Sequence, residues 1–411
     1  MEIQANEEEV VISEPPHLHL ISAFLAMEPP DVLISFAREC GGGLIGEKVQ
    51  SFIWNHCISK TVENGGCQQG PYLKRVLKKL IGEIESDGVV VFDELYEHYA
   101  FIMTSLKDDS FPEGNSRVVK RISFLFPDEC SELSSCPKSK KLEVSLQCSV
   151  NMLEGDTGCS IWPSCLFLSE FILSFPEIFF DKSCFEVGSG VGLVGICLAH
   201  VKASSVVLSD GDLSTLSNMR LNLESNLLST RSDVPEHDKD SSTVQCIHLP
   251  WESATENELQ NFAPDIVLGA DVIYDPLYLP HLVQVLTGLL KRGTSYPNHG
   301  NDPCEGCQPD FRWIRSEVQN EGSKCDTTKG EVESCSAPCV EHEDHAFERG
   351  PVAYIASVIR NMETFNYFLE LTKQANLIVN DITENSQPFN LLCYAKSYQR
   401  SSIRIFSISY M

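Results

Sequence analysis

The sequence lacks long apolar runs and is poor in positive charge. No uninterrupted apolar stretch approaches the ~18 residues that a membrane-spanning helix requires. The 31 lysines and arginines are outnumbered by 58 aspartates and glutamates, and the net charge of −27 argues against broad contact with nucleic-acid phosphates. A secretion signal begins with basic residues that are followed by an apolar run. Residues 1–10 are acidic instead, so we expect no secretion signal. These absences predict a soluble, cytoplasmic protein that contacts neither membrane nor nucleic acid and attracts basic protein partners.

Cysteine is abundant, but its placement argues against a disulfide framework. The 17 cysteines are spread over 411 residues, and several lie inside apolar runs typical of a buried core, as Cys165, Cys184, Cys197 and Cys246 do. Reduced thiols in a reducing compartment are therefore the simpler interpretation.

One long segment lacks apolar periodicity. Residues 292–349 are rich in Gly, Pro, Ser, Asn, Asp and Glu, so they bury too little surface to offset the loss of chain entropy, and we predict a disordered insert. Within it, Cys304-x-x-Cys307 and Cys335-x-x-x-Cys339 have spacings at which thiols can hold zinc. Only the first pair has the two-residue spacing typical of zinc sites. The alternative is that these cysteines have no common role in a disordered insert, so we predict no metal site.

The remaining sequence predicts two regions. Residues 1–115 are mostly helical in pattern, and in 71–86 apolar residues recur at three-and-four spacing, opposite basic residues that are either solvated or open to a partner. From residue 116, two alternating stretches typical of strands are followed by alternating strands and helices, which predict a parallel sheet. Residues 376–382 and 391–410 are rich in strand signals. We expect an N-terminal helical region and an α/β domain, residues 116–411, that contains the insert.

The most informative motif is a glycine-rich loop, Phe185-Glu186-Val187-Gly188-Ser189-Gly190-Val191-Gly192. A carboxylate at the end of an apolar strand, then glycines at alternate positions, are typical of a strand, a tight turn and a helix start. Such a loop lets backbone approach a nucleotide-like cofactor closely. Glu186 would repel a pyrophosphate but attract the sulfonium and ammonium of S-adenosylmethionine, so the charge favours that cofactor. Gly188, Ser189, Gly190 and Gly192 are the predicted cofactor-binding loop.

Two acids follow later strands. Asp210 comes after Val206-Val207-Leu208, about 20 residues beyond the glycine loop, where an acid can hold both ribose hydroxyls. The alternative is a turn acid that caps the next helix. The apolar run 265–270 predicts a strand buried on both faces, and Asp271 and Tyr274 follow it at the edge where such sheets place reactive groups. The alternative is a capping Asp271 with Tyr274 packed in the core.

Together these motifs resemble the seven-strand, class I S-adenosylmethionine-dependent methyltransferases, and the Asp-x-x-Tyr ending resembles their protein-lysine branch. Three further segments resemble that branch, namely 158–163, Leu249-Pro250-Trp251 and 354–364. The elongation factor 2 lysine methyltransferases are the family with the closest likeness, which covers most of 70–280 and 350–411. The resemblance implies a Rossmann-like sheet of seven strands with helices on both faces, preceded by a helical region.

The resemblance also implies roles for individual residues. Trp251 would lie beside the adenine and Trp162 near the methionine end of the cofactor, and the small Ala270 would leave room for it. Core packing is the alternative for both tryptophans. Asp271 would orient the lysine amine and stabilise its charge, while Tyr274 would add a polar group and an aromatic wall. The implied reaction is protein-lysine methylation by a monomer, with elongation factor 2 as substrate.

Three other functions stay open at this point. Nucleic-acid amino methyltransferases place two prolines where this chain has Val272 and Ile273, and the acidic balance also disfavours them. An NAD-dependent dehydrogenase would bring Glu186 next to a pyrophosphate. A non-catalytic interaction module would keep a methyltransferase-like scaffold and use the N-terminal helices, although the intact glycines and acids argue against it.

Overall fold

The computed structural model describes residues 15–59, 69–105, 117–127, 141–149, 157–228, 243–291 and 350–411. The predicted disordered insert, with its paired cysteines, lies outside the described residues. Within the described ranges, no helix is both long and apolar enough to span a bilayer. In the same ranges, no group of histidine, cysteine and acidic side chains could hold a metal ion, and no disulfide joins the cysteines.

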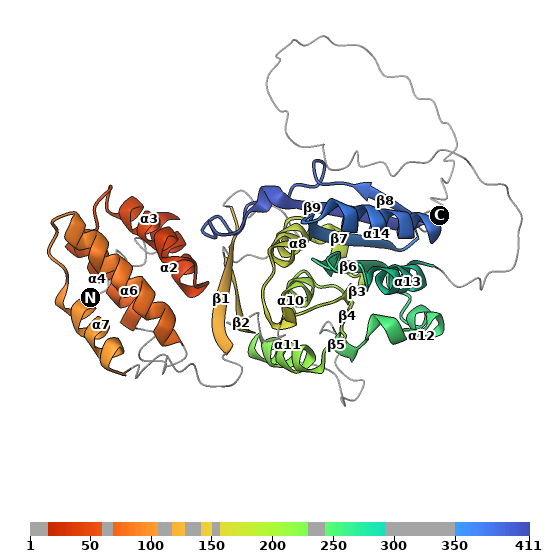
Figure 1. Cartoon of the computed structure of the whole chain (residues 1–411), viewed down its shortest axis with the longest axis horizontal. Coiled ribbons are helices and arrows are strands. Elements are labelled where there is room, and N and C mark those ends of the chain that lie inside the picture. The colour runs from red at the N-terminus through yellow and green to blue at the C-terminus, as the bar shows by residue number, and fades with distance from the viewer. Residues whose placement is uncertain are drawn as a thin grey trace, which may run out of the picture.

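Helices form the N-terminal region, which lies to one side of the molecule in Figure 1. They are α2 (Pro15–Leu25), α3 (Pro30–Cys40), α4 (Glu47–Ile53), the π-helix η1 (Trp54–Ile58), α6 (Gly70–Ser86) and α7 (Asp93–Ser105). The helix predicted over 71–86 is confirmed as α6, and its apolar residues from Leu73 to Ile84 are buried. The amphipathic pattern therefore reflects packing against the neighbouring helices.

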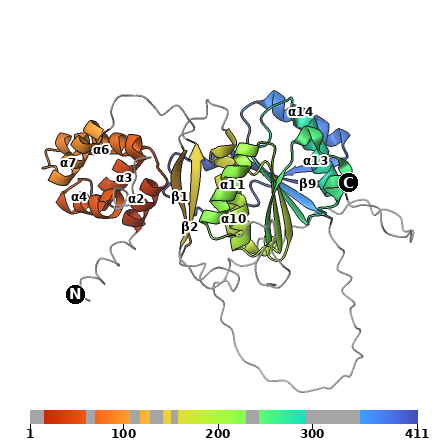
Figure 2. The ribbon, with the colours of Figure 1, turned by 90° about the horizontal axis from the view of Figure 1, so that it is seen from below.

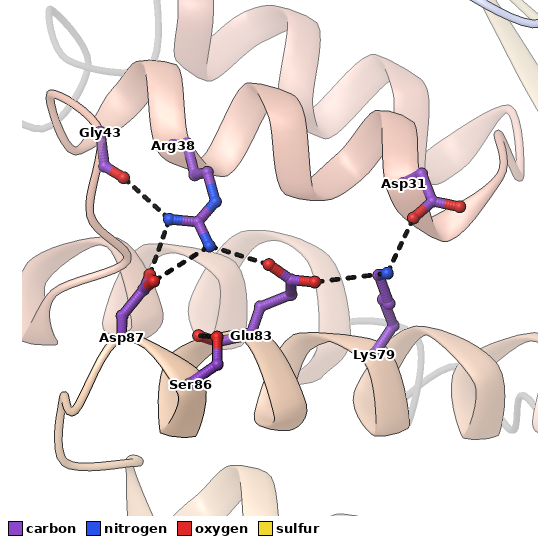
Figure 3. A network of polar contacts seen from close by, with 7 residues as sticks. All are labelled: Asp31, Arg38, Gly43, Lys79, Glu83, Ser86 and Asp87. Carbon is purple, nitrogen blue, oxygen red and sulfur yellow. Dashed lines mark hydrogen bonds and ion pairs between the residues drawn. The ribbon is translucent and has the colours of Figure 1, made fainter.

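Charged side chains join α3 to α6, as Figure 3 shows. Arg38 of α3 donates to Asp87 at 2.6 Å and to Glu83 at 2.8 Å. Lys79, on the basic outer face of α6, pairs with Asp31 at 3.0 Å and with Glu83 at 3.3 Å. Solvent screens these pairs, so they orient the two helices more than they stabilise them.

A two-stranded antiparallel hairpin lies between the helical region and the larger sheet (Figures 1 and 2). Its strands, β1 (Arg117–Leu125) and β2 (Lys141–Ser149), confirm the two predicted alternating stretches. Helix α11 (Leu213–Ser225) and the residue after it hold β2 through asparagines. The Gln147 N–H donates to Asn222 Oδ1 at 2.7 Å, and the Ser145 N–H donates to Asn226 Oδ1 at 3.0 Å.

The larger sheet has seven strands in the order β5-β4-β3-β6-β7-β9-β8. They are β3 (Ser183–Val187), β4 (Ser205–Asp210), β5 (Thr243–His248), β6 (Ile266–Ala270), β7 (Val352–Val358), β8 (Leu377–Asp381) and β9 (Ile403–Tyr410). Strands β3 to β7 pair in parallel, and β9 is antiparallel to both its neighbours. The expected fold class is confirmed: a seven-strand Rossmann-like sheet with helices on both faces, preceded by helices.

Helices cover both faces of this sheet (Figure 2). On one face lie α8 (Pro163–Ser174), α10 (Leu193–His200) and α11, and on the other lie α12 (Glu256–Gln260), α13 (Leu279–Leu290) and α14 (Met362–Gln374). In β3, Cys184 joins the core of the first face, whereas Phe185 and Val187 join the core of the second. Because successive strand residues point to opposite faces, Glu186 lies on the side of α8 and α10.

The end of the chain differs in part from the prediction. Strands β8 and β9 lie within the two stretches rich in strand signals, but residues 391–399 form turns and irregular backbone, and η8 (Arg400–Ser402) is a short 3₁₀ helix. Side chains from distant elements bind this segment. The Leu392 N–H donates to Glu170 Oε1 at 3.0 Å, and the buried hydroxyl of Tyr394 accepts from the Ser123 N–H at 2.8 Å. These contacts replace the ladder that a strand would need.

The same turns join the helical region to the α/β domain. Glu28, between α2 and α3, accepts hydrogen bonds from the N–H and the hydroxyl of Ser397, at 2.9 and 2.7 Å. Glu170 of α8 is fully buried, accepts from the Tyr398 hydroxyl at 2.9 Å and pairs with Arg400 at 3.0 Å. Burial raises the pKa of Glu170 above its ordinary value, although Arg400 opposes that shift.

We expect Glu170→Ala to lower the free energy of unfolding by about 3 kcal/mol, because it leaves buried donors and a guanidinium without their acceptor. Urea denaturation measures this change. The matched control is Glu177→Ala on the exposed surface, for which a change within about 0.5 kcal/mol is expected. Equal stability losses in the two variants would contradict the assigned importance of this buried carboxylate.

Candidate active site

The candidate site lies at the carboxyl ends of the parallel strands. β3 is central, with β4 and β5 on one side and β6 and β7 on the other. From β3 the chain adds β4 and β5 on one side, and it then returns to add β6 and β7 on the other side. The loops after β3 and β6 therefore run in opposite directions and leave a crevice between them. Sheets of this kind bind ligands in that crevice. The structure brings all the predicted site residues to this edge or directly beside it.

The glycine loop is tightly enclosed. Gly188, Gly190 and Gly192 have φ values of 64°, 52° and 83°, which lie in the left-handed region that favours glycine. A Cβ on Gly190 would come within 3.0 Å of the Gly158 carbonyl oxygen, and one on Gly188 would come within 3.5 Å of the Trp251 ring. The loop therefore packs between η5 (Thr157–Cys159) and η6 (Trp251–Ser253), two segments that are distant in sequence.

Hydrogen bonds of Ser189 hold this loop in place. Its hydroxyl donates to the Glu186 carbonyl at 3.2 Å and accepts from the Ser209 N–H at 3.0 Å. Its own N–H donates to the Ser209 carbonyl at 2.9 Å. The side chain is buried, so any contact of Ser189 with a cofactor would come from its backbone, as the sequence analysis expects.

Glu186 is a buried carboxylate with one oxygen unused. Its exposed fraction is 1%, and Oε2 has no hydrogen-bond partner within the described part of the chain. Burial raises the pKa of Glu186 well above its ordinary value, the hydrogen bond with Ser189 opposes that rise, and nearby Asp210 adds to it. A cation seated here would favour the ionised form. This orphaned oxygen and the left-handed glycines fit a cationic nucleoside cofactor.

Asp210 is not the cap of the following helix. Asp212 caps α11 by accepting from the Thr215 N–H at 2.7 Å. Asp210 instead binds the turn: its Oδ2 accepts from the Gly190 N–H at 3.1 Å, and its Oδ1 accepts from the Asp212 N–H at 3.1 Å. Burial raises its pKa, and these hydrogen bonds oppose the rise. The acid thus joins the β4 turn to the glycine loop, where its remaining lone pairs could receive ribose hydroxyls.

The two tryptophans lie on either side of this edge and are both half-buried. Trp162 directly precedes α8, and its indole N–H donates to the Thr157 carbonyl at 3.1 Å. Trp251 packs against Gly188. Ala270, the last residue of β6, is also half-buried. Their roles toward a cofactor stay predictions.

Asp271 holds three segments together. Its φ is 55°, a left-handed conformation that aspartate tolerates better than most residues, and its exposed fraction is only 8%. Oδ2 accepts from the Ser164 N–H at 3.2 Å, in the first turn of α8. Oδ1 accepts from the Val358 N–H at 3.2 Å, at the end of β7. The carboxylate therefore connects the turn after β6 to α8 and β7.

Arg360 completes this arrangement, and the sequence analysis did not identify it. Its guanidinium donates to Asp271 Oδ1 at 3.1 Å and lies 5.4 Å from the centre of the Trp162 ring. The side chain is about half exposed, so it lies between the buried carboxylate and the surface. The sequence could have identified Arg360 from its position after an apolar strand, because residues that follow parallel strands lie at the same edge of the sheet.

Tyr274 points outward from the same turn, with an exposed fraction of 61%. Burial of its hydroxyl end raises its pKa, and the carboxylates of Asp275 and Asp210 add to the rise. With Arg360 and Asn361, Tyr274 also lines a cavity beside the start of α14. Core packing of Tyr274 is therefore wrong, whereas a part in accepting substrate stays a prediction.

Comparisons with known proteins give consistent results. A family model described as "Lysine methyltransferase" matches residues 140–296. The human "Protein-lysine N-methyltransferase EEF2KMT" is 30% identical over 252 residues, which are 60% of this chain and 68% of the human protein. "Protein-lysine N-methyltransferase EFM3" of Chaetomium thermophilum is 32% identical over 142 residues, 33% of this chain and 39% of that protein.

Solved structures are more distant. The "T. Thermophilus 16S rRNA N2 G1207 methyltransferase (RsmC) in complex with AdoMet and Guanosine" aligns with 12% identity and a TM-score of 0.36, over 74% of this chain and 53% of that one. At this distance the strand order of the sheet, rather than the alignment, identifies the fold.

We expect Glu186→Gln to weaken S-adenosylmethionine binding about tenfold or more, because the neutral amide cannot balance a cation. A cation binds the ionised carboxylate, and the pKa of Glu186 is raised, so the wild-type dissociation constant should rise as pH falls. The variant should lose this pH dependence. Calorimetric titration between about pH 6 and 8.5 measures both effects. Wild-type affinity in the variant, or the same pH slope, would rule out this role.

We expect Arg360→Met to destabilise the fold by about 1–2 kcal/mol, because it leaves the buried Asp271 carboxylate without its cation. Arg360→Lys should recover part of the loss. Arg404→Met is the matched control, since Arg404 pairs at 3.5 Å with Asp381, which is about half exposed rather than buried, and should contribute about 0.5 kcal/mol or less. Thermal or urea unfolding compares the three variants, and equal losses at both arginines would refute the distinction.

Proposed function

The chain belongs to the lysine methyltransferase family, and we propose that it transfers a methyl group from S-adenosylmethionine to a lysine side chain of elongation factor 2. The observation that carries the proposal is one sheet edge with a buried, partly unpartnered Glu186 beside a glycine loop, and the Asp271–Tyr274 turn across from it. The likeness to the human protein-lysine methyltransferase supports a protein substrate. The net charge of −27 supports it as well, because it disfavours nucleic acid.

The residues at this edge fit the cofactor of the family. Glu186 would face the ammonium of the cofactor, and the glycine loop would approach its amino-acid part. Asp210 would accept hydrogen bonds from the ribose hydroxyls. Trp251 would cover the adenine, while Trp162 and Ala270 would lie near the methionine end. When bound, S-adenosylmethionine supplies an electrophilic methyl group for in-line displacement by nitrogen.

The acceptor lysine must lose a proton, either to a group of the site or to water, before its nitrogen can attack. A lysine ammonium has an ordinary pKa of about 10.4, so the neutral amine is a minor species near neutral pH. Tyr274 is exposed beside the cavity and would contact the incoming side chain. Asp271 would hold the turn in place, because its carboxylate accepts from the Ser164 and Val358 N–H groups and pairs with Arg360. Orientation of this kind can lower the barrier by several kcal/mol, about 7 in well-ordered systems.

We further propose that the helices of residues 1–115 help to dock a large substrate onto the catalytic domain, residues 116–411. The bonds from Glu28 to Ser397 support a defined placement of those helices. A monomeric protein of the cytosol is consistent with described cysteines that form no disulfide.

Labelling identifies the substrate. Purified full-length protein and labelled S-adenosylmethionine are incubated with extract from cells that lack the enzyme, and the labelled band is identified by mass spectrometry. We expect label on a lysine of elongation factor 2. Label in RNA would favour the nucleic-acid alternative, and no label in any macromolecule would favour a non-catalytic module.

We expect Asp271→Asn to lower the methylation rate about 100-fold while S-adenosylmethionine affinity stays within about threefold. Asparagine tolerates the left-handed backbone at this position, so it tests the charge with less backbone strain than alanine would cause. Asp381→Asn, in a surface ion pair, is the control. Turnover that is unchanged in Asp271→Asn would refute the role of this acid, and the rate and affinity are measured on the same preparations.

A further inference from the structure

Exposed apolar side chains gather around the active-site edge. Leu213 follows β4, Tyr274, Leu277 and Tyr278 follow β6, and Met362 begins α14 after β7. Leu277 is 80% exposed and Leu213 is 64% exposed, so neither contributes to the core. Large apolar side chains exposed together at one place are typical of a surface that contacts another molecule.

The same loops carry acids for which the described part of the chain supplies no ion-pair partner. Asp212, Glu252 and Glu363 are exposed and Asp275 is half-buried, and within the described residues none of the four forms an ion pair. Several basic groups near this edge already have partners within the described residues, and Arg117, which lies beside α11, donates to the Ser214 hydroxyl and to Asn218 Oδ1. Arg360 pairs with Asp271, while Arg400 and Arg404, near the start of β9, pair with Glu170 and Asp381.

Tyr274 connects this surface to the catalytic site. Its ring lines the cavity that Arg360, Asn361 and Thr364 also line, beside Met362. Asp210 ends β4 and Tyr274 follows β6, so the two residues come from strands on either side of β3 at the same edge of the sheet. A chain bound across these loops would therefore lie next to the position where a lysine must enter.

We propose that these residues form an acceptor rim, defined as the five apolar and four acidic residues above, that binds the segment of the protein substrate around the target lysine. The rim selects a segment that is both basic and apolar. This inference rests on the proposed methylation of a protein lysine. Uncompensated carboxylates attract positive charge, and the aromatic and aliphatic side chains bury apolar surface on contact. A second copy of this acidic chain would be repelled.

A peptide-binding measurement tests the rim without depending on turnover. The probe is a fluorescent peptide whose central lysine is flanked by arginines and leucines, and its partner probe carries glutamates in place of the arginines. Fluorescence anisotropy with the full-length protein should show binding of the basic probe, at least about tenfold tighter than that of the acidic probe. Binding of the basic probe should weaken as salt rises from about 0.05 to 0.5 M.

Two sets of variants locate the binding surface. Neutralising three rim acids together, Glu252→Gln, Asp275→Asn and Glu363→Gln, should weaken binding of the basic probe about five- to tenfold. The charge-matched control, Glu177→Gln, Glu224→Gln and Glu370→Gln, should change it less than about twofold. Leu277→Ala with Met362→Ala should weaken binding about fivefold, and the exposed pair Leu221→Ala with Ile378→Ala should not.

The outcomes separate the two proposals. The rim proposal would be overturned if the basic probe did not bind, or if rim and control variants lost equal affinity. It would also be overturned if the acid substitutions weakened binding while the two apolar substitutions did not. If wild-type protein still labels a protein lysine in extract, the proposed function stands when the rim fails. Absence of any labelling by wild type would instead reject the proposed function, whatever the peptide result.

Discussion

The carboxylate of Asp271 is the contact on which the geometry of the active-site edge depends. It connects the turn after β6 to Ser164, Val358 and Arg360, which lie 107, 87 and 89 positions away. A single buried anion thus aligns the start of α8 with the ends of two central strands. The left-handed backbone at Asp271 turns the chain sharply, so Tyr274 emerges at the surface. If this carboxylate were lost, both walls of the crevice would become free to move.

Two further buried acids, Glu170 and Glu28, bind one irregular segment near the end of the chain. Both bind within residues 391–402, one from α8 and the other from the N-terminal helices. Each carboxylate accepts backbone and hydroxyl hydrogen bonds, which satisfies polar groups that would otherwise be buried without partners. This irregular segment therefore helps to join the helical region to the catalytic domain, together with contacts of α2 and Gln69 with β1.

Charge is distributed according to function. Glu186 and Asp210 are buried, and burial raises the pKa of each, so a cation beside them would favour their ionised forms. The acids of the acceptor rim are more accessible to solvent than these two buried carboxylates. Arg360 separates the two zones, because it neutralises Asp271 and stacks near Trp162. One sheet edge can in this way receive a cationic cofactor and a basic substrate from different directions.

The sequence alone determined the central strand, the glycine loop and the Asp271–Tyr274 ending, because each follows from local rules of strand burial and left-handed turns. The helix over 71–86 was equally readable from its apolar spacing. Only the tertiary structure decided that Asp212 rather than Asp210 caps α11, since both acids suit a helix start and the backbone geometry selects between them. It alone also paired Arg360 with Asp271 and made residues 391–399 turns and irregular backbone. Those outcomes depend on which distant segments become neighbours when the core packs, and no local pattern encodes that choice.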